Sequence, residues 1–395
     1  MGERNLSSKI AWRREDGKTR FEEDESAYSK LRVSFKDFIL RVGALSLAPK
    51  GVLPDCVTWW MEWQTDNVVF PYFASPDHDV DIQKCRERNI TLDIRAPLGG
   101  GTSWLDKGCP INGSGFRREH PKCPPTLEEF YRILFTAYAK DIGKEFGIKT
   151  RFKPINDVEV YCDDGVWRKI SIASGVPTPT YMAVGAGIQV TPIPWDRVDE
   201  VIIPPPEKFA DKETKTMRDR STCLNDVVGR EVTLEELGEV LKHSCEKAFG
   251  LTMVNTEIFW DKVPGYDAVK GMLTSDSWFW DRAEAQKFKD TPIGPSVKRG
   301  EARVKIPQGP FVRAVVLREK DRIINLLITG SLHASPLIPE SPVHKIEREV
   351  QGAPIDVEAI KERVEKVLSL EGQEIPNITS EQLAELIFRA CEIAS

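Results

Sequence analysis

The sequence lacks the features of a membrane-spanning, secreted or zinc-binding protein. No apolar run is long enough to cross a bilayer, and residues 1–18 contain no apolar segment of the kind that a secretory signal requires. The eight cysteines are scattered at positions 56, 85, 109, 123, 162, 223, 245 and 391. They form no C-x-x-C pair and have no histidine at zinc spacing, so we expect reduced thiols in a cytoplasmic protein.

Neither sign of charge dominates the composition. The 395 residues include 55 Lys and Arg against 61 Asp and Glu, which gives a net charge of −6. Such a balance provides no global attraction for nucleic acid or for anionic lipid, so any anionic ligand must be bound by local groups. The chain is 41% apolar, and its length is sufficient for two domains with cores of their own.

Two capped helices are the clearest elements of the first 260 residues. Thr126 and Glu129 match a capping box that begins a helix expected to end at Gly147, and the same pattern at 233–236 begins one expected to end at Gly250. Strand patterns account for much of the remainder, at 57–64, 67–74, 89–96, 157–174 and 180–190, the fourth of them a hairpin with an Asp-Asp-Gly turn at 163–165. The region therefore predicts a mixed β-sheet flanked by helices.

The pattern changes after Asp261 and predicts a smaller α+β domain. Strand-like runs at 301–307 and 311–330 precede two helices. Asp356 is expected to cap the first helix, and Thr379 with Gln382 to cap the last. We therefore predict an α+β protein with one domain over residues 1–260 and a second over residues 261–395.

Three consecutive glycines raise the main functional question. They lie in the motif R-x-x-x-G-G-G-T-x-x-x-D-x-G, which runs from Arg95 to Gly108. Glycine loses more backbone freedom on folding than any other residue, so three in a row are costly, although a flexible hairpin would look the same. Further along, Asn156 and Asp157 precede the predicted hairpin, and Lys169 lies just inside the strand that follows its turn.

The order of these motifs resembles the lipoate-protein ligase branch of the biotin/lipoate ligase family. The likeness continues through the arginine-containing stretch and helix at 217–250 and through "DSWFW" at 276–280, which resembles the start of the family's accessory domain. It can be followed from about Trp59 to Lys320. The resemblance implies a biotin/lipoate ligase-like catalytic domain at 1–260 and an accessory domain at 261–395.

The resemblance also implies a two-step reaction. A carboxylic acid, typically lipoate, reacts with ATP to give an acyl-adenylate, and the acyl group then passes to a lysine of a lipoyl-type carrier domain of the E2 or H-protein kind. Lys169 is the implied catalytic residue, because an ammonium there would bridge the carboxylate and the α-phosphate. The implied cofactor-binding residues are Arg95, Gly99, Gly100, Gly101, Thr102, Asn156 and Asp157. Asp157 is also the implied ligand of Mg²⁺.

Several positions depart from the family pattern. Ala96 stands where a second arginine is usual, Leu105 where a histidine is frequent, and Ile172 where glycine would be expected. These departures leave the identity of the acyl group open.

Two other functions stay open at this point. One is a thioester-dependent acyltransferase, for which Cys109 or Cys162 would be the nucleophile and His120 the nearest histidine in sequence. The other is a non-catalytic assembly factor that binds a cofactor or a carrier domain.

Overall fold

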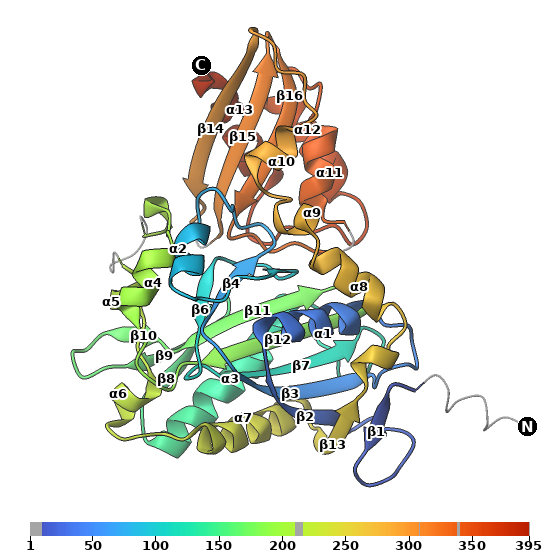
Figure 1. Cartoon of the computed structure of the whole chain (residues 1–395), viewed down its shortest axis with the longest axis vertical. Helices are drawn as coiled ribbons and strands as arrows, with labels where there is room; N and C mark the ends of the chain where they lie inside the picture. Colours follow the sequence, from blue (N-terminus) through green and yellow to red (C-terminus); the bar gives the residue numbers. More distant parts are fainter. Residues whose placement is uncertain (1–9, 210–215, 308, 338–339, 395) are drawn as a thin grey trace, which may run out of the picture.

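The computed structural model describes residues 10–209, 216–307, 309–337 and 340–394 (Figure 1). A larger unit is built around a seven-stranded sheet, and a smaller unit around a three-stranded sheet lies above it in this view. Within the described ranges, no helix is both long and apolar enough to cross a membrane.

The central sheet combines parallel and antiparallel strands in the order β1-β13-β2-β3-β7-β12-β11. β2 pairs in parallel with β13 and β3, and the other neighbours are antiparallel. The strands are β1 (Trp12–Arg14), β2 (Glu25–Val33), β3 (Cys56–Trp63), β7 (Ile111–Arg117), β11 (Ser171–Pro177), β12 (Tyr181–Ile188) and β13 (Thr252–Ile258). The predicted mixed sheet is therefore confirmed.

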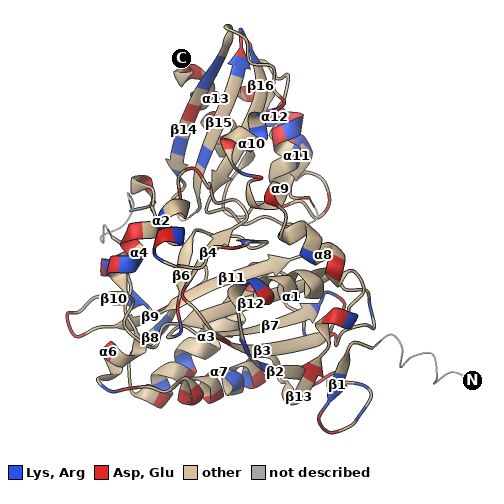
Figure 2. Ribbon diagram, viewed as in Figure 1, with Lys and Arg blue, Asp and Glu red and all other residues tan. Residues whose placement is uncertain are grey.

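Helices cover both faces of this sheet. α3 (Leu127–Phe146) and α7 (Leu234–Phe249) pack together on one face, whereas α1 (Phe35–Leu47) and α8 (Tyr266–Leu273) pack together on the other. Alternate side chains of β3 serve the two cores, as the two-residue period of a strand requires. Charged residues gather along α3 and α7, while the central strands carry few (Figure 2).

The predicted helix boundaries of the larger unit are confirmed. Thr126 accepts a hydrogen bond from the Glu129 amide, and α3 ends at Gly147 in the left-handed conformation. At α7 the Thr233 and Glu236 side chains complete a capping box, and Gly250 again ends the helix. Caps of this kind satisfy backbone groups that the helix itself cannot pair, which is why they mark its ends.

Two small sheets and several short helices complete the larger unit around the central sheet. One sheet has the order β10-β9-β8 and the other β5-β4-β6. Their strands are β4 (Asn67–Pro71), β5 (Arg95–Ala96), β6 (Ser103–Leu105), β8 (Thr150–Lys153), β9 (Asp157–Tyr161) and β10 (Trp167–Lys169). The short helices are α2 (Ile82–Glu87), α4 (Trp195–Val201), η2 (Pro206–Phe209), α5 (Met217–Arg220) and α6 (Leu224–Val228). A further short helix, η3 (Trp260–Lys262), lies beside α8.

One predicted strand is much shorter than expected. The run 89–96 forms a strand only at Arg95 and Ala96, and Thr91 makes a single isolated bridge to Asn67. The reason is that α2 precedes it and Asn89, with φ of 54°, turns the chain before it becomes extended.

The smaller unit is a three-stranded antiparallel sheet covered by helices. Its strands are β14 (Val297–Lys305), β15 (Phe311–Glu319) and β16 (Arg322–Gly330), and its helices are α9 (Asp276–Phe279), α10 (Glu284–Phe288), α11 (Pro342–Glu349), α12 (Val357–Leu368) and α13 (Ser380–Ile393). The run 311–330 is thus a hairpin of two strands that turns at Lys320 and Asp321. Asp356 caps α12 and Thr379 caps α13, as predicted.

The cores of the two units interlock near the expected boundary. Val269 and Leu273 of α8 lie after residue 260, yet they pack into the core of the larger unit. Conversely, Tyr72 and Phe73 of the larger unit pack into the core of the smaller one. The apolar face of α8 covers α1, so core packing crosses residue 260, and the division into domains at 1–260 and 261–395 stays a prediction.

Candidate active site

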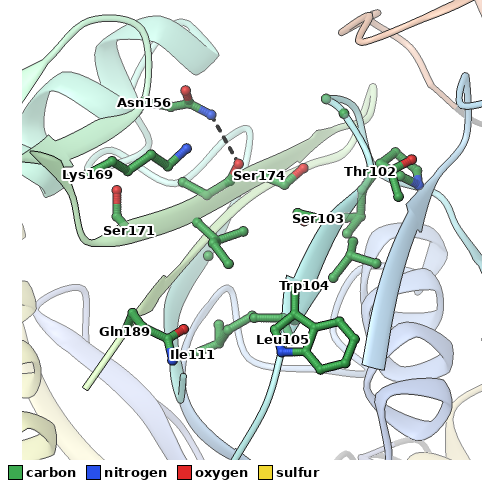
Figure 3. Close-up of a pocket in the computed structure, with 18 of the residues that line it drawn as sticks. Thr102, Ser103, Trp104, Leu105, Ile111, Asn156, Lys169, Ser171, Ser174 and Gln189 are labelled. Atoms are coloured by element: carbon green, nitrogen blue, oxygen red, sulfur yellow. Dashed lines mark hydrogen bonds between the residues drawn. The ribbon is translucent and has the colours of Figure 1, made fainter. Parts of the chain in front are cut away.

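A pocket of about 350 Å³ opens between the central sheet, the small sheets and the smaller unit. Figure 3 shows Asn156, Lys169, Ser171 and Ser174 on one side, facing Thr102 and Ser103 across the cavity, with Trp104, Leu105 and Ile111 below them. The pocket therefore has polar walls at one end and apolar side chains at the other.

The β9–β10 hairpin and the start of β11 form the first wall, which we call the hairpin wall (residues 156–174). The Lys169 ammonium lies 2.6 Å from Asp157 Oδ1, and both side chains are only partly exposed. Asn156 Nδ2 donates to the Ala173 carbonyl at 3.0 Å. The antiparallel register, with Lys169 opposite Glu159, brings Lys169 next to the start of β9. Three residues singled out from the sequence, Asn156, Asp157 and Lys169, thus lie together at the pocket.

The glycine loop, Gly99–Thr102, lines the facing side of the pocket. The Gly99 carbonyl accepts a hydrogen bond from Ser174 Oγ at 2.8 Å, so the loop and the hairpin wall are in direct contact. Gly100 has φ of +105°, a conformation that L side chains rarely adopt, so a larger residue there would strain the backbone as well as fill the site. Thr102 Oγ1 is buried without a hydrogen-bond partner in the described part of the chain.

The absence of a side chain at Gly99 has a structural cause in the smaller unit. A Cβ at this position would lie 2.5 Å from Nδ1 of His333, which also lines the pocket. The Gly100 amide donates to the Leu332 carbonyl at 2.9 Å. The glycine loop therefore packs against the smaller unit as well as lining the pocket.

Apolar side chains make up much of the remaining lining of the pocket. Phe35, Phe38 and Val42 of α1 line it together with Trp59 and Ile111 of the sheet. A second apolar group lies towards α4 and α5 and comprises Trp104, Ile193, Trp195, Val198, Ile202 and Met217. Such a lining suits a hydrocarbon chain more than a charged group.

Arg95 does not line the pocket, contrary to the expectation that it would supply charge to a phosphate or carboxylate. Its side chain is 0% exposed, and it lies over the Phe70 ring with Cζ 4.3 Å from the ring centre. The guanidinium donates to four main-chain carbonyls, those of Pro71, Tyr72, Ala74 and Phe279. Burial lowers the pKa of Arg95 to about 9. Arg95 thus holds together the chain segments behind the glycine loop.

The cysteines proposed for a thioester route are not among the residues that line the pocket. Cys109 is fully buried, and burial raises the pKa of its thiol well above the usual value. Cys162 follows β9 in the hairpin turn. His120 accepts a hydrogen bond from the Lys122 amide, and in the described ranges no hydrogen bond joins it to either thiol. This arrangement does not provide the activated thiolate that a thioester acyltransferase needs.

Only one group of three potential metal ligands occurs in the described residues, and it lies elsewhere. His78, Glu284 and Glu301 bring their ligand atoms within 4.8 Å of one another. Arg299 forms ion pairs with both carboxylates, at 2.7 and 2.8 Å, which already neutralises much of their charge. In the described residues, no such group of three includes Asp157. The magnesium ion expected there would therefore need oxygen ligands from the substrate in addition to Asp157 and Asn156.

Sequence reasoning missed several residues of the pocket. His333, Ser174 and Arg220 line it, as do the aromatic residues of α1. The helix had a recognisable signal, because Ser34 accepts a hydrogen bond from the Asp37 amide as an N-cap residue. His333 had none, since nothing local connects it with the glycine loop.

Comparison with known proteins identifies a family and a fold. Residues 50–246 match the family model described as the lipoyl protein ligase A/B catalytic domain. Comparison of the sequence with curated proteins gives no match. Solved structures of the same fold include LipL1 of P. falciparum in complex with lipoate, with a TM-score of 0.61 and 11% identity over 93% of this chain and 99% of that one.

Two further structures match a smaller share of this chain. A bi-partite lipoate protein ligase of Thermoplasma acidophilum, analysed with its E2 lipoyl domain, has a TM-score of 0.53 and 18% identity over 64% of this chain and 95% of its own. Lipoate-protein ligase A bound with ATP has a TM-score of 0.51 and 14% identity over 64% of this chain and 98% of its own. At these identities the likeness shows the fold, and the predicted biotin/lipoate ligase-like architecture is confirmed.

Proposed function

The chain belongs, through residues 50–246, to the family of lipoyl protein ligase A/B catalytic domains, and from that premise we propose that it attaches lipoate, or a related carboxylic acid, to a lysine of a carrier protein. The proposed route is ATP-dependent and passes through an acyl-adenylate. The proposed compartment is the cytoplasm.

The observation that carries the proposal is a cation at one end of a pocket whose other end is apolar. Lys169 lies in the hairpin wall, Trp104, Leu105 and Ile111 lie below it (Figure 3), and the side chains of α1 belong to the same lining. A long-chain acid would place its hydrocarbon among Phe35, Phe38 and Val42 and its carboxylate at the Lys169 ammonium. Amphipathic acids such as lipoate and octanoate have this combination of properties.

In the first step, a carboxylate oxygen attacks the α-phosphorus of ATP, and the bond from that phosphorus to the pyrophosphate oxygen breaks. Negative charge develops on the phosphoryl oxygens as this happens. The Lys169 ammonium is proposed to stabilise that charge, because a fixed cation in a partly buried site acts without the reorganisation that water would need. Asp157 orients the ammonium through their ion pair.

The nucleotide is proposed to lie along the glycine loop. Gly99, Gly100 and Gly101 let the ligand approach the backbone, and Thr102 Oγ1 is buried with no partner in the described ranges, so it is available to a phosphate or ribose oxygen. Arg95 is assigned no contact with ATP; we propose that it positions the loop by holding the carbonyls behind it.

Asp157 and Asn156 are the proposed holders of the Mg²⁺ that accompanies ATP. The ion pair with Lys169 involves Asp157 Oδ1, which leaves Oδ2, and Asn156 donates through Nδ2, which leaves its amide oxygen. These are the hard oxygen ligands that magnesium prefers beside substrate phosphates. When bound, the ion would neutralise part of the phosphate charge.

In the second step the ε-amine of the carrier lysine attacks the acyl carbon, an amide bond forms, and AMP leaves with the oxygen of the mixed anhydride. The proposed acceptor is a lipoyl-type domain of the E2 or H-protein kind. The likeness to the ligase analysed with its E2 lipoyl domain supports this choice.

The test measures pyrophosphate release from ATP in the presence of lipoate, octanoate or biotin, followed by the mass of an added E2 lipoyl domain. We expect lipoate or octanoate to stimulate release and the carrier to gain one acyl group. If no acid stimulates release but an octanoyl thioester acylates the carrier without ATP, the thioester route replaces the adenylating one. If neither occurs, the non-catalytic alternative gains support.

A further inference from the structure

The segment that follows β16 brings the smaller unit to the edge of the pocket. The Gly330 amide donates to the Phe73 carbonyl at 2.8 Å, and the Leu332 carbonyl accepts from the Gly100 amide at 2.9 Å. These two bonds fix the main chain immediately before His333, which lines the pocket. Part of the pocket wall is therefore supplied by the smaller unit, outside the segment that matches the ligase family.

His333 reaches the pocket at its polar end. Its ring lies against Gly99, where a Cβ would be 2.5 Å from Nδ1. The Gly99 carbonyl in turn accepts from Ser174 Oγ, and Asn156 donates to the main-chain carbonyl next to Ser174. His333 and Lys169 therefore approach the same end of the pocket, one from the glycine loop and the other from the hairpin wall.

The imidazole is chemically available to a ligand. In the part of the chain that the structure describes, no hydrogen bond or ion pair involves its ring nitrogens. Burial lowers the pKa of His333 to about 4, so at neutral pH the ring is uncharged and offers one N–H donor and one acceptor. The charged groups that line the same pocket are Asp157, Lys169 and Arg220.

We propose that His333 donates a ring N–H to a phosphoryl oxygen of the acyl-adenylate, opposite the contact that Lys169 makes. The inference rests on the proposed function and deepens it, because it makes the smaller unit part of the ligand site. The ring is partly exposed and lines the pocket, so an anionic oxygen at this end would give its N–H a hydrogen bond of the stronger, charge-assisted kind.

The experiment titrates the full-length chain with an acyl-sulfamoyl adenosine, a stable analogue whose sulfamate replaces the phosphate, and with lipoate alone. His333→Leu and His333→Phe remove the donor and keep apolar bulk, whereas His333→Gln keeps an N–H. We expect the two apolar variants to bind the analogue roughly 10- to 100-fold more weakly, as for a lost hydrogen bond to a charged group, and His333→Gln to recover most of the affinity. Affinity for lipoate alone should change little in all three.

The matched control is His243→Leu, at an exposed histidine of α7, which should bind both ligands as the wild type does. The inference is overturned if His333→Leu or His333→Phe binds the analogue with wild-type affinity. It is also overturned if all three His333 variants, His333→Gln included, lose affinity for lipoate and for the analogue to the same extent, because a packing role would produce that result. A wild-type chain that does not bind the analogue at all contradicts the proposed function itself, so the two failures are distinguishable.

Discussion

The two polar walls of the pocket are built in different ways. The hairpin wall comes from one continuous stretch, residues 156–174, in which antiparallel pairing alone brings Lys169 beside Asp157. The facing wall combines the glycine loop with His333, which lies far along the chain in the smaller unit. The first wall depends on local register and the second on docking, so substitutions in the two walls should have different consequences.

The largest effect is expected from Lys169→Ala in the hairpin wall. Removing one fixed cation from the site of charge development should slow pyrophosphate release by roughly 10²- to 10³-fold, or about 3–4 kcal/mol. The melting temperature should change little, because the Lys169 side chain is 30% exposed and contributes little to a core.

The control for that measurement is Lys153→Ala. Lys153 lies on the same small sheet and pairs with Glu159, which keeps its second partner Arg151. We expect wild-type rates. A Lys169→Ala chain that releases pyrophosphate at the wild-type rate would remove Lys169 from the proposed mechanism.

The next largest effect concerns the wall formed by the glycine loop and His333, and it is a loss of stability. Gly99→Ala adds a Cβ against the His333 ring and should lower the free energy of unfolding by about 1–3 kcal/mol, as overpacking does. Combining it with His333→Ala should recover part of that loss, because the nearest ring atoms are gone. Urea unfolding of the two single variants and the double variant gives the coupling energy. Strict additivity would show that the two residues do not meet.

The smallest effect is a change in the pH dependence of stability. The pKa of His333 is lowered from 6.5 to about 4 by burial, so between these values the unfolded chain binds a proton that the folded chain does not. Stability should therefore fall as pH decreases from about 6.5 towards 4, and this group should cause no further loss below that range. Melting curves of wild type and His333→Gln over the same window should diverge, with the wild type losing more. Parallel curves would contradict the lowered pKa of the His333 ring.

The elements that the sequence predicted well are those fixed by neighbours in sequence. The capping residues of α3, α7, α12 and α13 and the hairpin at 163–165 depend on contacts within a few residues, so pattern and propensity were sufficient. Lys169 was singled out through the family resemblance, and the structure places it at the pocket. Its role in catalysis stays a prediction.

Residue type alone did not locate the parts of the site that depend on tertiary packing. Arg95 has the charge expected of a residue that binds phosphate. The direction of its side chain, however, is set by β5 and by a hydrogen bond to the carbonyl of Phe279, far along the chain. His333 reaches the loop only because β16 ends beside Phe73. Neither fact follows from local periodicity, because each depends on how the two cores interlock.

The buried Arg95 also affects how the molecule unfolds. It donates to the carbonyl of Phe279, and its own carbonyl accepts from Trp278 Nε1, so the larger unit and the chain leading into the smaller one hold each other at one point. Separating them would leave buried polar groups unpaired, at a cost of about 1–3 kcal/mol for each group. Unfolding either unit alone would carry this free-energy cost. We therefore expect heating to produce a single cooperative calorimetric transition rather than two.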